Sequence, residues 1–540
     1  MSISCSTNIH SQDKPNIVWI VTEDISPDLS FYGDCTAQTP HLDSLAGEAL
    51  IYENAYTTVG VCAPSRSSII TGMYPITLGT MHMRTGKDIN SWGRRIYSKN
   101  KPEVRDLSGV SVPQYSAVIP DMVKCFSEYL RAKGYFCTNN QKTDYQFATP
   151  RSSWDQNGPE AHWRNRTDDK PFFSVFNINV THESMLWKNA ELPLTVEPDK
   201  VTVPAYLPDN EVTRKTIARH YSNIELMDKK IGEIIAQLKK DGLYDNTIIF
   251  FYSDHGGPLP REKREIYDTG LRVPFLVKDV NGMTTGHTDR LISFVDLAPT
   301  MLSLAGIKPP AHLQGKAFMG AFTREPRNHV FGSSDRFDSF TDRIRSVRDK
   351  RYLYIVNYLP HLSKYKPVKY RMQIPMMPSF VSLQQIGKLN PQQMKWFGTK
   401  TKEELYDCNN DPENLVNLVD DPQYRQVLNK LRSTYHEFSQ SVPDLGQMNE
   451  SRMLWFMWPN GKQPKTLDAT VTLHGNMAKI SCETKGASIS YIIASDDAVP
   501  TLNDAWQLYT DPIHVPKGKT IYTLAERIGY ACSNITKHKP

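Results

Sequence analysis

The stretch NTIIFFYSDHGG, residues 246–257, places a run of apolar and aromatic residues directly before an acid, a histidine and two glycines. Two other segments share this design. PNIVWIVTED, residues 15–24, ends in two acids, and PFFSVFNINVTH, residues 171–182, ends at a histidine. Continuous apolar runs of this length predict strands buried on both faces, as in a mostly parallel sheet.

Helical patterns separate these strands. Residues 40–50, 117–134 and 213–242 carry apolar residues at three- and four-residue spacing, and the last two segments end at glycines. Strands that alternate with helices predict an α/β fold with a doubly wound, mostly parallel sheet. Ligands of such folds bind at the carboxyl ends of the strands, where the acids and histidines of all three runs stand.

The last third of the chain has another character. Residues 344–360 resemble antiparallel strands, residues 404–438 lead from a strand into a helix, and residues 465–535 contain short alternating strands typical of a small β-sandwich. We therefore expect a disordered N-terminal tail (1–13), a catalytic α/β domain (14–343), a smaller α+β subdomain with an antiparallel sheet (344–460) and a terminal β-sandwich (465–540).

Composition excludes several classes of protein. The chain has 540 residues, which is too long for one ordinary core, and its net charge of +5 is too small to indicate nucleic-acid binding. No apolar run reaches the about 18 residues that a membrane span needs. The eight cysteines contain no C-x-x-C pair, so we expect mostly free thiols and no zinc site.

The first 15 residues are polar and lack the hydrophobic core of an export signal. Either the protein is cytoplasmic or an export segment has been removed from the chain. We expect the second, with a periplasmic or cell-surface location. An alternative interpretation of Cys5, which is followed by Ser-Thr-Asn, is that it is the remnant of a lipid-anchored bacterial N-terminus. The sequence does not specify an oligomeric state.

The strand-end acids suggest a metal site. Glu23 and Asp24 by themselves could be a helix cap and a solvated neighbour, but Asp254 and His255 follow a second buried strand. Three carboxylates and an imidazole at one sheet edge would repel or crowd one another without a cation. Oxygen-rich ligation suits calcium, or alternatively magnesium.

Cys62 lies in VCAPSRSSIITG, residues 61–72. A buried free cysteine is usually inert. Here Pro64 and Ser65 favour the start of a helix, so Cys62 is expected at a helix N-terminus, where negative charge is favoured.

CAPSR followed by Ser-Ser-Ile-Ile-Thr-Gly resembles the C-x-P-S-R…T-G motif of the formylglycine-dependent sulfatases. Similarity to this family extends over roughly residues 14–440 and implies an alkaline-phosphatase-like fold. It also implies that a maturase acts on the CAPSR segment and oxidises Cys62 to Cα-formylglycine, whose hydrate attacks sulfur. Cys62 would also face the metal, and Arg66 would hold the hydrated aldehyde.

Three further segments are similar to the family and imply roles for their residues. Residues 263–274 resemble its lysine-bearing stretch that ends in G-x-R-x-P, which implies Lys263 as a sulfate ligand. Residues 133–145 are similar to another segment of the family, which implies Lys142 as the second sulfate ligand. The segment PFFSVFNINVTH implies His182 as the acid that protonates the leaving oxygen or nitrogen.

The chain departs from the family pattern at three places. Glu23-Asp24 stands where Asp-Asp is usual, and Asp254-His255 where Asp-Asn is frequent. Asp144 stands where a histidine is usual, so the base that expels sulfate is Asp144 or another group. The C-terminal segments resemble the sulfamidase-like, or heparan N-sulfatase-like, branch, and residues 486–534 resemble chitobiase-type β-domains.

The substrate implied by the resemblance is a sulfated saccharide. His82 and Arg84, with Asp335 and Arg336, are candidate substrate ligands on loops, where function concentrates; otherwise they are ordinary solvated charges. The residues do not distinguish an O-sulfate from an N-sulfate.

Two other functions compete with a sulfatase. One is a phosphate or phosphonate ester hydrolase of the same superfold, although two lysines and one cation suit a sulfate monoanion better. The other is a catalytically silent glycan-binding protein. The complete CAPSR motif and both lysines favour an active sulfatase.

Overall fold

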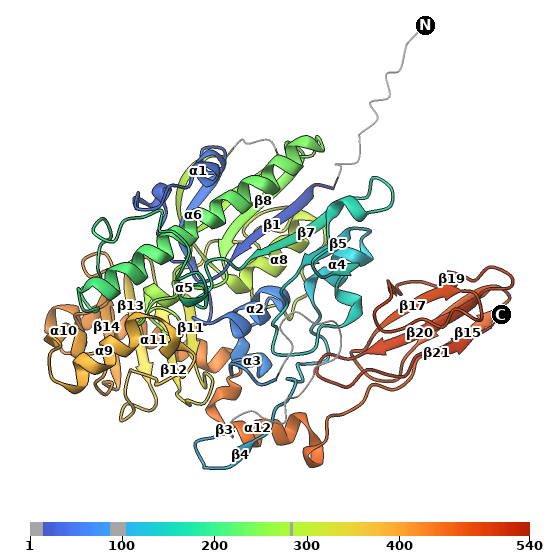
Figure 1. The fold of residues 1–540 in the computed structure, drawn as a ribbon. Coiled ribbons are helices and arrows are strands. Elements are labelled where there is room, and N and C mark those ends of the chain that lie inside the picture. Colours follow the sequence, from blue (N-terminus) through green and yellow to red (C-terminus); the bar gives the residue numbers. More distant parts are fainter. Residues whose placement is uncertain (1–13, 87–103, 281–283, 540) are drawn as a thin grey trace, which may run out of the picture.

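The computed structural model describes residues 14–86, 104–280 and 284–539, within which eight strands form one central sheet (Figure 1). Its strands are β1 (Asn16–Thr22), β2 (Leu50–Tyr56), β5 (Phe136–Asn140), β6 (Gln156–Asn157), β7 (Phe172–Ile178), β8 (Thr247–Ser253), β9 (Phe275–Lys278) and β10 (Gly286–Ser293). The order is β10-β2-β9-β8-β1-β7-β5-β6. β9 is antiparallel to β8 and β2, and the other pairs are parallel, which confirms the predicted α/β fold.

The three strands predicted from their apolar runs lie side by side in the order β8-β1-β7. Thr22, the last residue of β1, is opposite Ser253 of β8 and Ile178 of β7. Because all three strands are parallel and in line, the residues that follow them meet at one edge of the sheet. This alignment creates the candidate site.

Helices cover both faces of the sheet. They are α1 (Pro40–Ala46), α2 (Cys62–Thr71), α4 (Phe126–Ala132), α6 (Glu211–Lys240) and α8 (Leu297–Leu304). Successive residues of β1 point to opposite faces: Val18 and Ile20 share a core with α1 and α6, whereas Trp19 and Val21 pack in the core of α2, α4 and α8. The sheet is therefore buried on both sides, as its sequence predicts.

The helix predicted over residues 117–134 forms only as α4, and its first half is not helical. Pro120 disfavours helical geometry at Ile119. The Ile119 carbonyl oxygen accepts a hydrogen bond of 2.6 Å from Arg527 of the C-terminal region. A contact from more than 400 residues away thus replaces the local helical pattern.

A second, antiparallel sheet has the order β11-β12-β13-β14. Its strands are β11 (Val330–Ser334), β12 (Ile344–Arg348), β13 (Tyr352–Asn357) and β14 (Glu403–Asp407). Leu428 and Leu431 of α11 (Arg425–Ser441) pack on this sheet. The expected boundary at residue 343/344 falls between β11 and its partner β12, and the domain boundaries stay a prediction.

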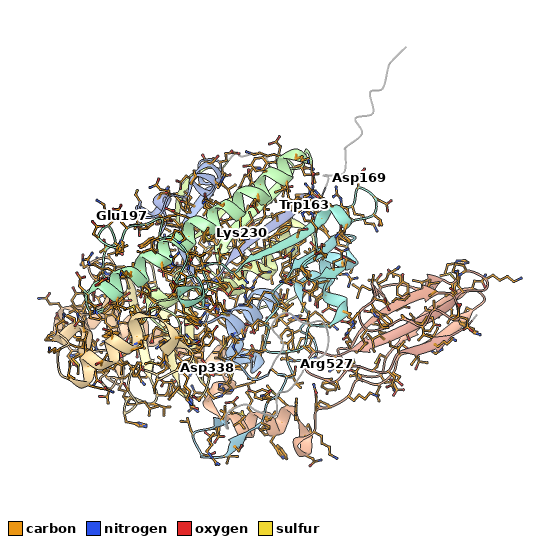
Figure 2. All side chains as sticks on the ribbon, in the orientation of Figure 1. Trp163, Asp169, Glu197, Lys230, Asp338 and Arg527 are labelled. Carbon is orange, nitrogen blue, oxygen red and sulfur yellow. The ribbon has the colours of Figure 1, made fainter. Side chains whose placement is uncertain are left out.

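The C-terminal residues form two facing sheets, β15-β16-β19 and β18-β17-β20-β21. Their strands are β15 (Thr470–His474), β16 (Met477–Ser481), β17 (Ser488–Ala494), β18 (Gln507–Leu508), β19 (Ile513–His514), β20 (Thr520–Glu526) and β21 (Thr536–His538). Ile480 of one sheet and Ile521 of the other share a core, which confirms the predicted sandwich. It projects from the body of the molecule beside α4, with Arg527 at the junction (Figures 1 and 2).

Shorter elements complete the fold. They are α3 (Pro75–Leu78), α5 (Met185–Lys188), α7 (Asp268–Leu271), α9 (Met376–Gln385), α10 (Pro391–Met394), α12 (Glu450–Met457) and the hairpin of β3 (Val104–Arg105) and β4 (Ser111–Val112). Among the described residues, no helix has the length and apolar character to cross a membrane. The cysteines in this part of the chain are free thiols; Cys5 and the tail 1–13 lie outside the described residues.

Candidate active site

The predicted acids and histidine meet at the carboxyl edge of the central sheet. Asp24 follows β1, and Asp254 and His255 follow β8. The Nε2 atom of His255 lies 3.0 Å from Oδ1 of Asp24 and 3.6 Å from Oδ1 of Asp254. All three side chains are buried, so their charges interact in a low-dielectric environment.

This cluster fits a bound cation. Oδ1 of Asp24 and Oδ1 of Asp254 are buried and have no hydrogen-bond partner among the described residues, an arrangement that is costly for a carboxylate unless a cation compensates it. Nδ1 of His255 lies 2.9 Å from the Gly256 carbonyl oxygen, which leaves Nε2 facing the two carboxylates. Burial lowers the pKa of His255, but Asp254 and Asp24 raise it to about 10, so the site attracts positive charge. Carboxylate oxygens with one imidazole suit a divalent ion.

Glu23 stands at the edge of this cluster. Its Oε2 atom accepts a hydrogen bond of 2.9 Å from Lys142, and its Oε1 atom lies 3.7 Å from Nη2 of Arg66. Burial raises the pKa of Glu23, yet Lys142, His182 and Arg66 lower it to about 2. Glu23 is therefore ionised. Its carboxylate lies between the predicted metal site and the predicted sulfate site.

Cys62 is the first residue of α2, as predicted, and it is fully buried. Its Sγ atom lies 3.2 Å from Nε2 of His255. Burial raises the pKa of the Cys62 thiol, but the nearby Lys142 and Lys263 lower it to about 6. Position 62 therefore favours a negatively charged group beside the metal cluster.

Arg66 lies one helical turn after Cys62 and ties α2 to two strands of the sheet. Its Nε atom donates to Oδ2 of Asp254 at 2.9 Å, and its Nη1 atom donates to Oδ1 of Asn177 at 2.6 Å. Because a guanidinium holds its donors in a fixed plane, Arg66 orients both partners. It thereby fixes the start of α2 relative to β7 and β8.

The two predicted sulfate-binding lysines flank position 62. Nζ of Lys142 is 2.9 Å from Oε2 of Glu23, and Nζ of Lys263 is 2.5 Å from Oδ2 of Asp24. Burial lowers the pKa of each lysine, but the surrounding negative charges raise it overall. Both lysines therefore carry a positive charge near Cys62, as an anion-binding site requires.

His182 lies at the opening of the site, with 13% of its side chain exposed. The backbone N–H of Ser184 donates to Nδ1 of His182 at 3.2 Å, so the ring proton of the neutral form is on Nε2. This Nε2 atom faces the site, 4.0 Å from Oε2 of Glu23. The orientation suits a group that donates a proton at the mouth of the site.

Asp144 lies beside the site rather than in the metal cluster. Its Oδ1 atom is 3.5 Å from Nη1 of Arg84, and its other oxygen is buried without a hydrogen-bond partner in the part of the chain that the structure describes. The backbone of both residues is left-handed, with φ of 54° at Asp144 and 63° at Arg84. The side chain of Arg84 is 27% exposed, although its Nη1 atom is buried.

The other predicted substrate ligands are buried in the fold. His82, Asp335 and Arg336 are 4%, 1% and 2% exposed. Arg336 donates to Glu450, and Arg345 donates to Asp335. The charges of Asp335 and Arg336 are therefore balanced inside the protein, and of these four predicted ligands only Arg84 is partly exposed.

Comparisons with known proteins identify the family. The family model described as "Sulfatase" matches residues 15–307, and the model described as "N-sulphoglucosamine sulphohydrolase, C-terminal" matches residues 261–366. An ulvan-active sulfatase of Formosa agariphila is 42% identical over 97% of this chain and 91% of its own. The chain belongs to the sulfatase family. It is a sulfuric ester hydrolase.

More distant relatives extend the comparison. The human N-sulphoglucosamine sulphohydrolase is 24% identical to this sulfatase over 77% of this chain and 88% of its own. Among solved structures, one described as a 2-O GAG sulfatase has a TM-score of 0.55 at 19% identity and covers 80% of this chain and 93% of its own. A phosphonate monoester hydrolase from Silicibacter pomeroyi has the same TM-score at 16% identity and covers 80% and 96%. These structures show the shared fold, and the sequence relatives favour the sulfatase over the phosphonate hydrolase.

Sequence reasoning missed two parts of the sulfatase site. Asn177, the partner of Arg66, is a polar residue inside a mostly apolar strand, and this interruption was a usable signal. Glu183 follows His182 and accepts two hydrogen bonds from Arg264, of 2.9 and 2.6 Å. No local pattern pairs residues 81 positions apart, so this contact required the tertiary structure.

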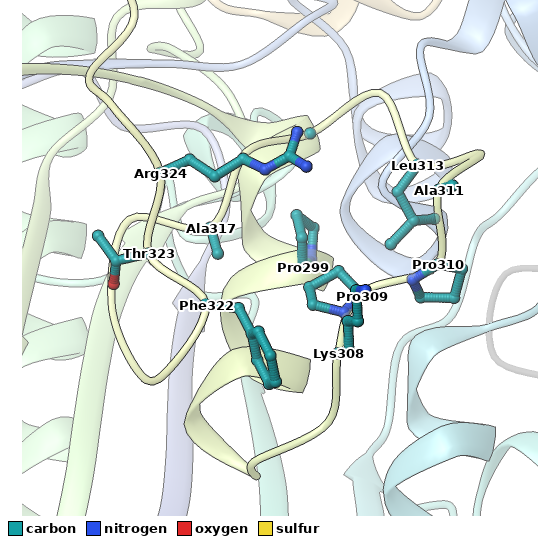
Figure 3. Close-up of a pocket in the computed structure, with 11 residues that line it drawn as sticks. Pro299, Lys308, Pro309, Pro310, Ala311, Leu313, Ala317, Phe322, Thr323 and Arg324 are labelled. Carbon is teal, nitrogen blue, oxygen red and sulfur yellow. The ribbon is translucent and has the colours of Figure 1, made fainter.

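A separate cavity of about 290 Å³ lies beside α8 (Figure 3). Pro299, Phe322 and Arg324 are among its lining residues. Pro299 lies near Gly72, which follows the C-terminal end of α2: a Cβ atom at Gly72 would be 3.3 Å from Cδ of Pro299. Ten helical residues span roughly 15 Å, so the cavity and Cys62 are at opposite ends of this helix. None of the predicted catalytic residues lines this cavity.

Proposed function

We propose that this sulfatase removes sulfate esters from a sulfated polysaccharide of the ulvan type. The observation that carries the proposal is the buried position of Cys62 between two lysines and a metal-binding cluster. The substrate class is supported by the 42% identity to a relative described as an ulvan-active sulfatase. Ulvan-type oligosaccharides are therefore the first substrates to test.

A second candidate bond is an N-sulfate on glucosamine. It is favoured by the match of residues 261–366 to the C-terminal part of N-sulphoglucosamine sulphohydrolase. Parallel assays of sulfate release from ulvan oligosaccharides and from N-sulfated glucosamine distinguish the two candidates. Release from the first substrate alone supports our proposal, and release from the second alone overturns it.

We further propose that Cys62 is the precursor of formylglycine and that the metal is calcium, with magnesium as the alternative. Formylglycine at position 62 would supply a hydrated aldehyde with two hydroxyl groups as the nucleophile. Asp24, Asp254 and His255, with Glu23 at the edge, would hold the cation, which would supply fixed positive charge beside position 62.

The protein's own residues then have separate tasks. Lys142 and Lys263 bind the oxygens of the sulfate and balance the charge that develops during transfer. Arg66 keeps the start of α2 and Asp254 in register. His182, with its Nε2 proton toward the site, protonates the departing sugar oxygen. Asp144 remains our candidate for the base that assists sulfate release, and Arg84 for a substrate ligand.

Maturation implies a partner enzyme. Every residue of α2, including Cys62, is buried in the folded protein. A maturase could not reach the CAPSR segment in this state. We therefore propose that it acts before this helix is buried. Because the proposed polymer substrate cannot cross a membrane, we also propose that the protein acts outside the cytoplasm.

The mass of the peptide that contains residue 62 tests the proposal directly. Protein from the native host should carry an aldehyde at this position and release sulfate with many turnovers. Cys62→Ala should fold normally and lose turnover entirely, because the precursor of the nucleophile is absent. Multiple turnovers by Cys62→Ala, measured as released sulfate, would refute the assignment.

A further inference from the structure

We propose that Tyr370, oriented by Trp187, forms a stacking platform for the sugar ring that carries the sulfate. The inference rests on the proposed saccharide function and assigns the leaving-group side of the same site. Tyr370 belongs to the region that follows the antiparallel strand β13, whereas Trp187 lies in α5, directly after the general-acid candidate. The platform thus joins two parts of the chain at the mouth of the site.

The position of Tyr370 is fixed by its neighbour in sequence. Arg371 begins a short 3-10 helix, Arg371–Gln373, and is buried. Its Nη2 atom donates a hydrogen bond of 2.9 Å to the carbonyl oxygen of Lys263. The backbone of a sulfate-binding lysine is therefore connected to the residue next to Tyr370. The aromatic ring is held beside the site although it lies more than 100 residues later in the chain.

The ring of Tyr370 lies between the acid and a second aromatic side chain. Its centroid is 6.4 Å from the ring of His182 and 5.0 Å from the ring of Trp187. The contact with Trp187 is edge-to-face, with an interplanar angle of 78°. Such a contact orients Tyr370 without covering both of its faces.

Tyr370 also keeps a large exposed surface, 38% of the residue, beside a site lined by charged groups. Its partial burial raises the pKa of the phenol, so the ring is neutral at neutral pH. An exposed aromatic face carries no positive charge with which to bind a sulfate group. It suits the apolar C–H face of a pyranose, whose weakly positive hydrogens meet the negative face of the ring.

The direction in which the substrate must extend from the lysines also places the sugar on Tyr370. The sulfate would be held deep in the site by Lys142 and Lys263, which are buried or nearly so. The sugar must then extend outward past His182, which faces the departing oxygen. Tyr370 is the exposed aromatic residue that contacts the ring of His182. The sugar that carries the sulfate would therefore lie on Tyr370.

The experiment compares kcat and KM for sulfated ulvan oligosaccharides with the inhibition constant of inorganic sulfate, which occupies only the sulfate end. We expect Tyr370→Ala to raise KM roughly five- to tenfold with little change in kcat or in inhibition by sulfate. Tyr370→Phe keeps the ring and should behave like the wild type. Tyr370→Leu keeps bulk without an aromatic face and should resemble Tyr370→Ala.

Tyr358 provides a matched control. It is a tyrosine of the same region with nearly the same exposure, 39%, and its hydroxyl pairs with that of Tyr435 at 2.6 Å. Tyr358→Ala should leave KM unchanged. Melting temperatures of all variants, with and without a chelator, show whether fold and metal site are intact.

The outcomes separate the platform from the proposed function. If the wild type releases sulfate from ulvan oligosaccharides but the KM of Tyr370→Ala stays within twofold of it, the platform is wrong and the saccharide function stands. An equal loss in Tyr370→Phe would also overturn stacking, because the hydroxyl group would then be responsible. If the wild type hydrolyses only small aryl sulfates, the saccharide function fails, and the platform fails with it.

Discussion

Asp24 and Asp254 are the residues of this site whose contacts indicate a bound cation. Within the described part of the chain, each has one buried oxygen with no hydrogen-bond partner, while its second oxygen accepts from Lys263 or Arg66. Lys263 and Arg66 thus compensate only one oxygen of each carboxylate. The other two oxygens both face Nε2 of His255, the side on which a cation would bind. At the scale of single residues, charge balance therefore predicts where a metal ion binds.

Removal of one of these carboxylates should abolish the response to metal. We expect a chelator to lower the melting temperature of the wild type and calcium or magnesium to restore it. A ligand at 100 times its Kd stabilises the folded state by about 2.7 kcal/mol. Asp254→Ala should lose sulfatase activity, and its melting temperature, followed by calorimetry, should not respond to either treatment.

Asp209→Ala is the control for this measurement. Asp209 is an exposed acid that pairs with Arg214 outside the site. Its substitution should leave the metal response of the melting temperature unchanged. A chelator-sensitive melting temperature in Asp254→Ala would show that Asp254 is not a metal ligand.

At the scale of elements, α12 shows how distant segments support the site from behind. Glu450, its first residue, accepts hydrogen bonds from Arg336 after β11 at 2.7 Å and from Tyr115 at 2.9 Å. Arg336 in turn donates to the carbonyl oxygen of Met83, next to Arg84. Arg336 therefore connects α12 to the loop that carries Arg84.

This ion pair should make stability depend on pH. Burial raises the pKa of Glu450, but Arg336 and His82 lower it to about 2. A carboxylate with a lowered pKa stabilises the folded state above its unfolded pKa, near 4.5, and loses this effect as pH falls toward 2. Glu450→Gln should therefore reduce the free energy of unfolding by about 3 kcal/mol at pH 7.

The difference between wild type and Glu450→Gln should shrink as pH falls below about 5. Urea unfolding at pH 7, 5.5 and 4 measures this trend. Glu211→Gln, which removes an exposed pair with Lys215 on α6, should have little effect at any of these values. A difference that is constant or grows toward acid pH would contradict the assigned pKa direction.

At the scale of the whole molecule, the β-sandwich is joined to the segment that carries Lys142. Arg151, nine residues after Lys142, forms a buried ion pair with Glu526 of β20 at 2.7 Å, and Glu526 also accepts from the Arg151 backbone at 2.7 Å. Ile528 packs into the core of the catalytic sheet. The sandwich is thus part of the support of the active-site segment.

Glu526→Ala should therefore affect both stability and catalysis. It leaves Arg151 buried without its carboxylate, which costs about 3 kcal/mol or more. It should also lower kcat/KM on a sulfated oligosaccharide several-fold, because residues 142–151 lose a fixed point. Thermal unfolding and steady-state kinetics measure the two effects.

Asp496→Ala is the matched control within the sandwich. Asp496 pairs with Lys537 and Lys539 on the exposed surface, away from the catalytic body. Neither stability nor kcat/KM should change appreciably in this variant. If Glu526→Ala behaved the same way, the sandwich would be an independent appendage.

Much of the site could be predicted from local sequence. The apolar runs predicted β1, β7 and β8, and the residues that end them are the ones that meet. The CAPSR motif placed Cys62 at the start of α2 and Arg66 one turn later. These features are encoded within about ten consecutive residues, because strand burial and helix initiation depend on near neighbours.

Other features were decided only by the tertiary structure. The Ile119 carbonyl before α4 accepts a hydrogen bond from Arg527, and Arg336 is buried because Glu450 comes from a distant helix. Tyr370 reaches the mouth of the site through the contact of Arg371 with Lys263. Each of these depends on a partner more than 100 residues away, and a buried charge can be tolerated only where such a partner is brought to it. The sequence by itself determined the strands and the sulfatase motif, whereas folding decided which other charges are buried and paired and which residues stay exposed beside the site.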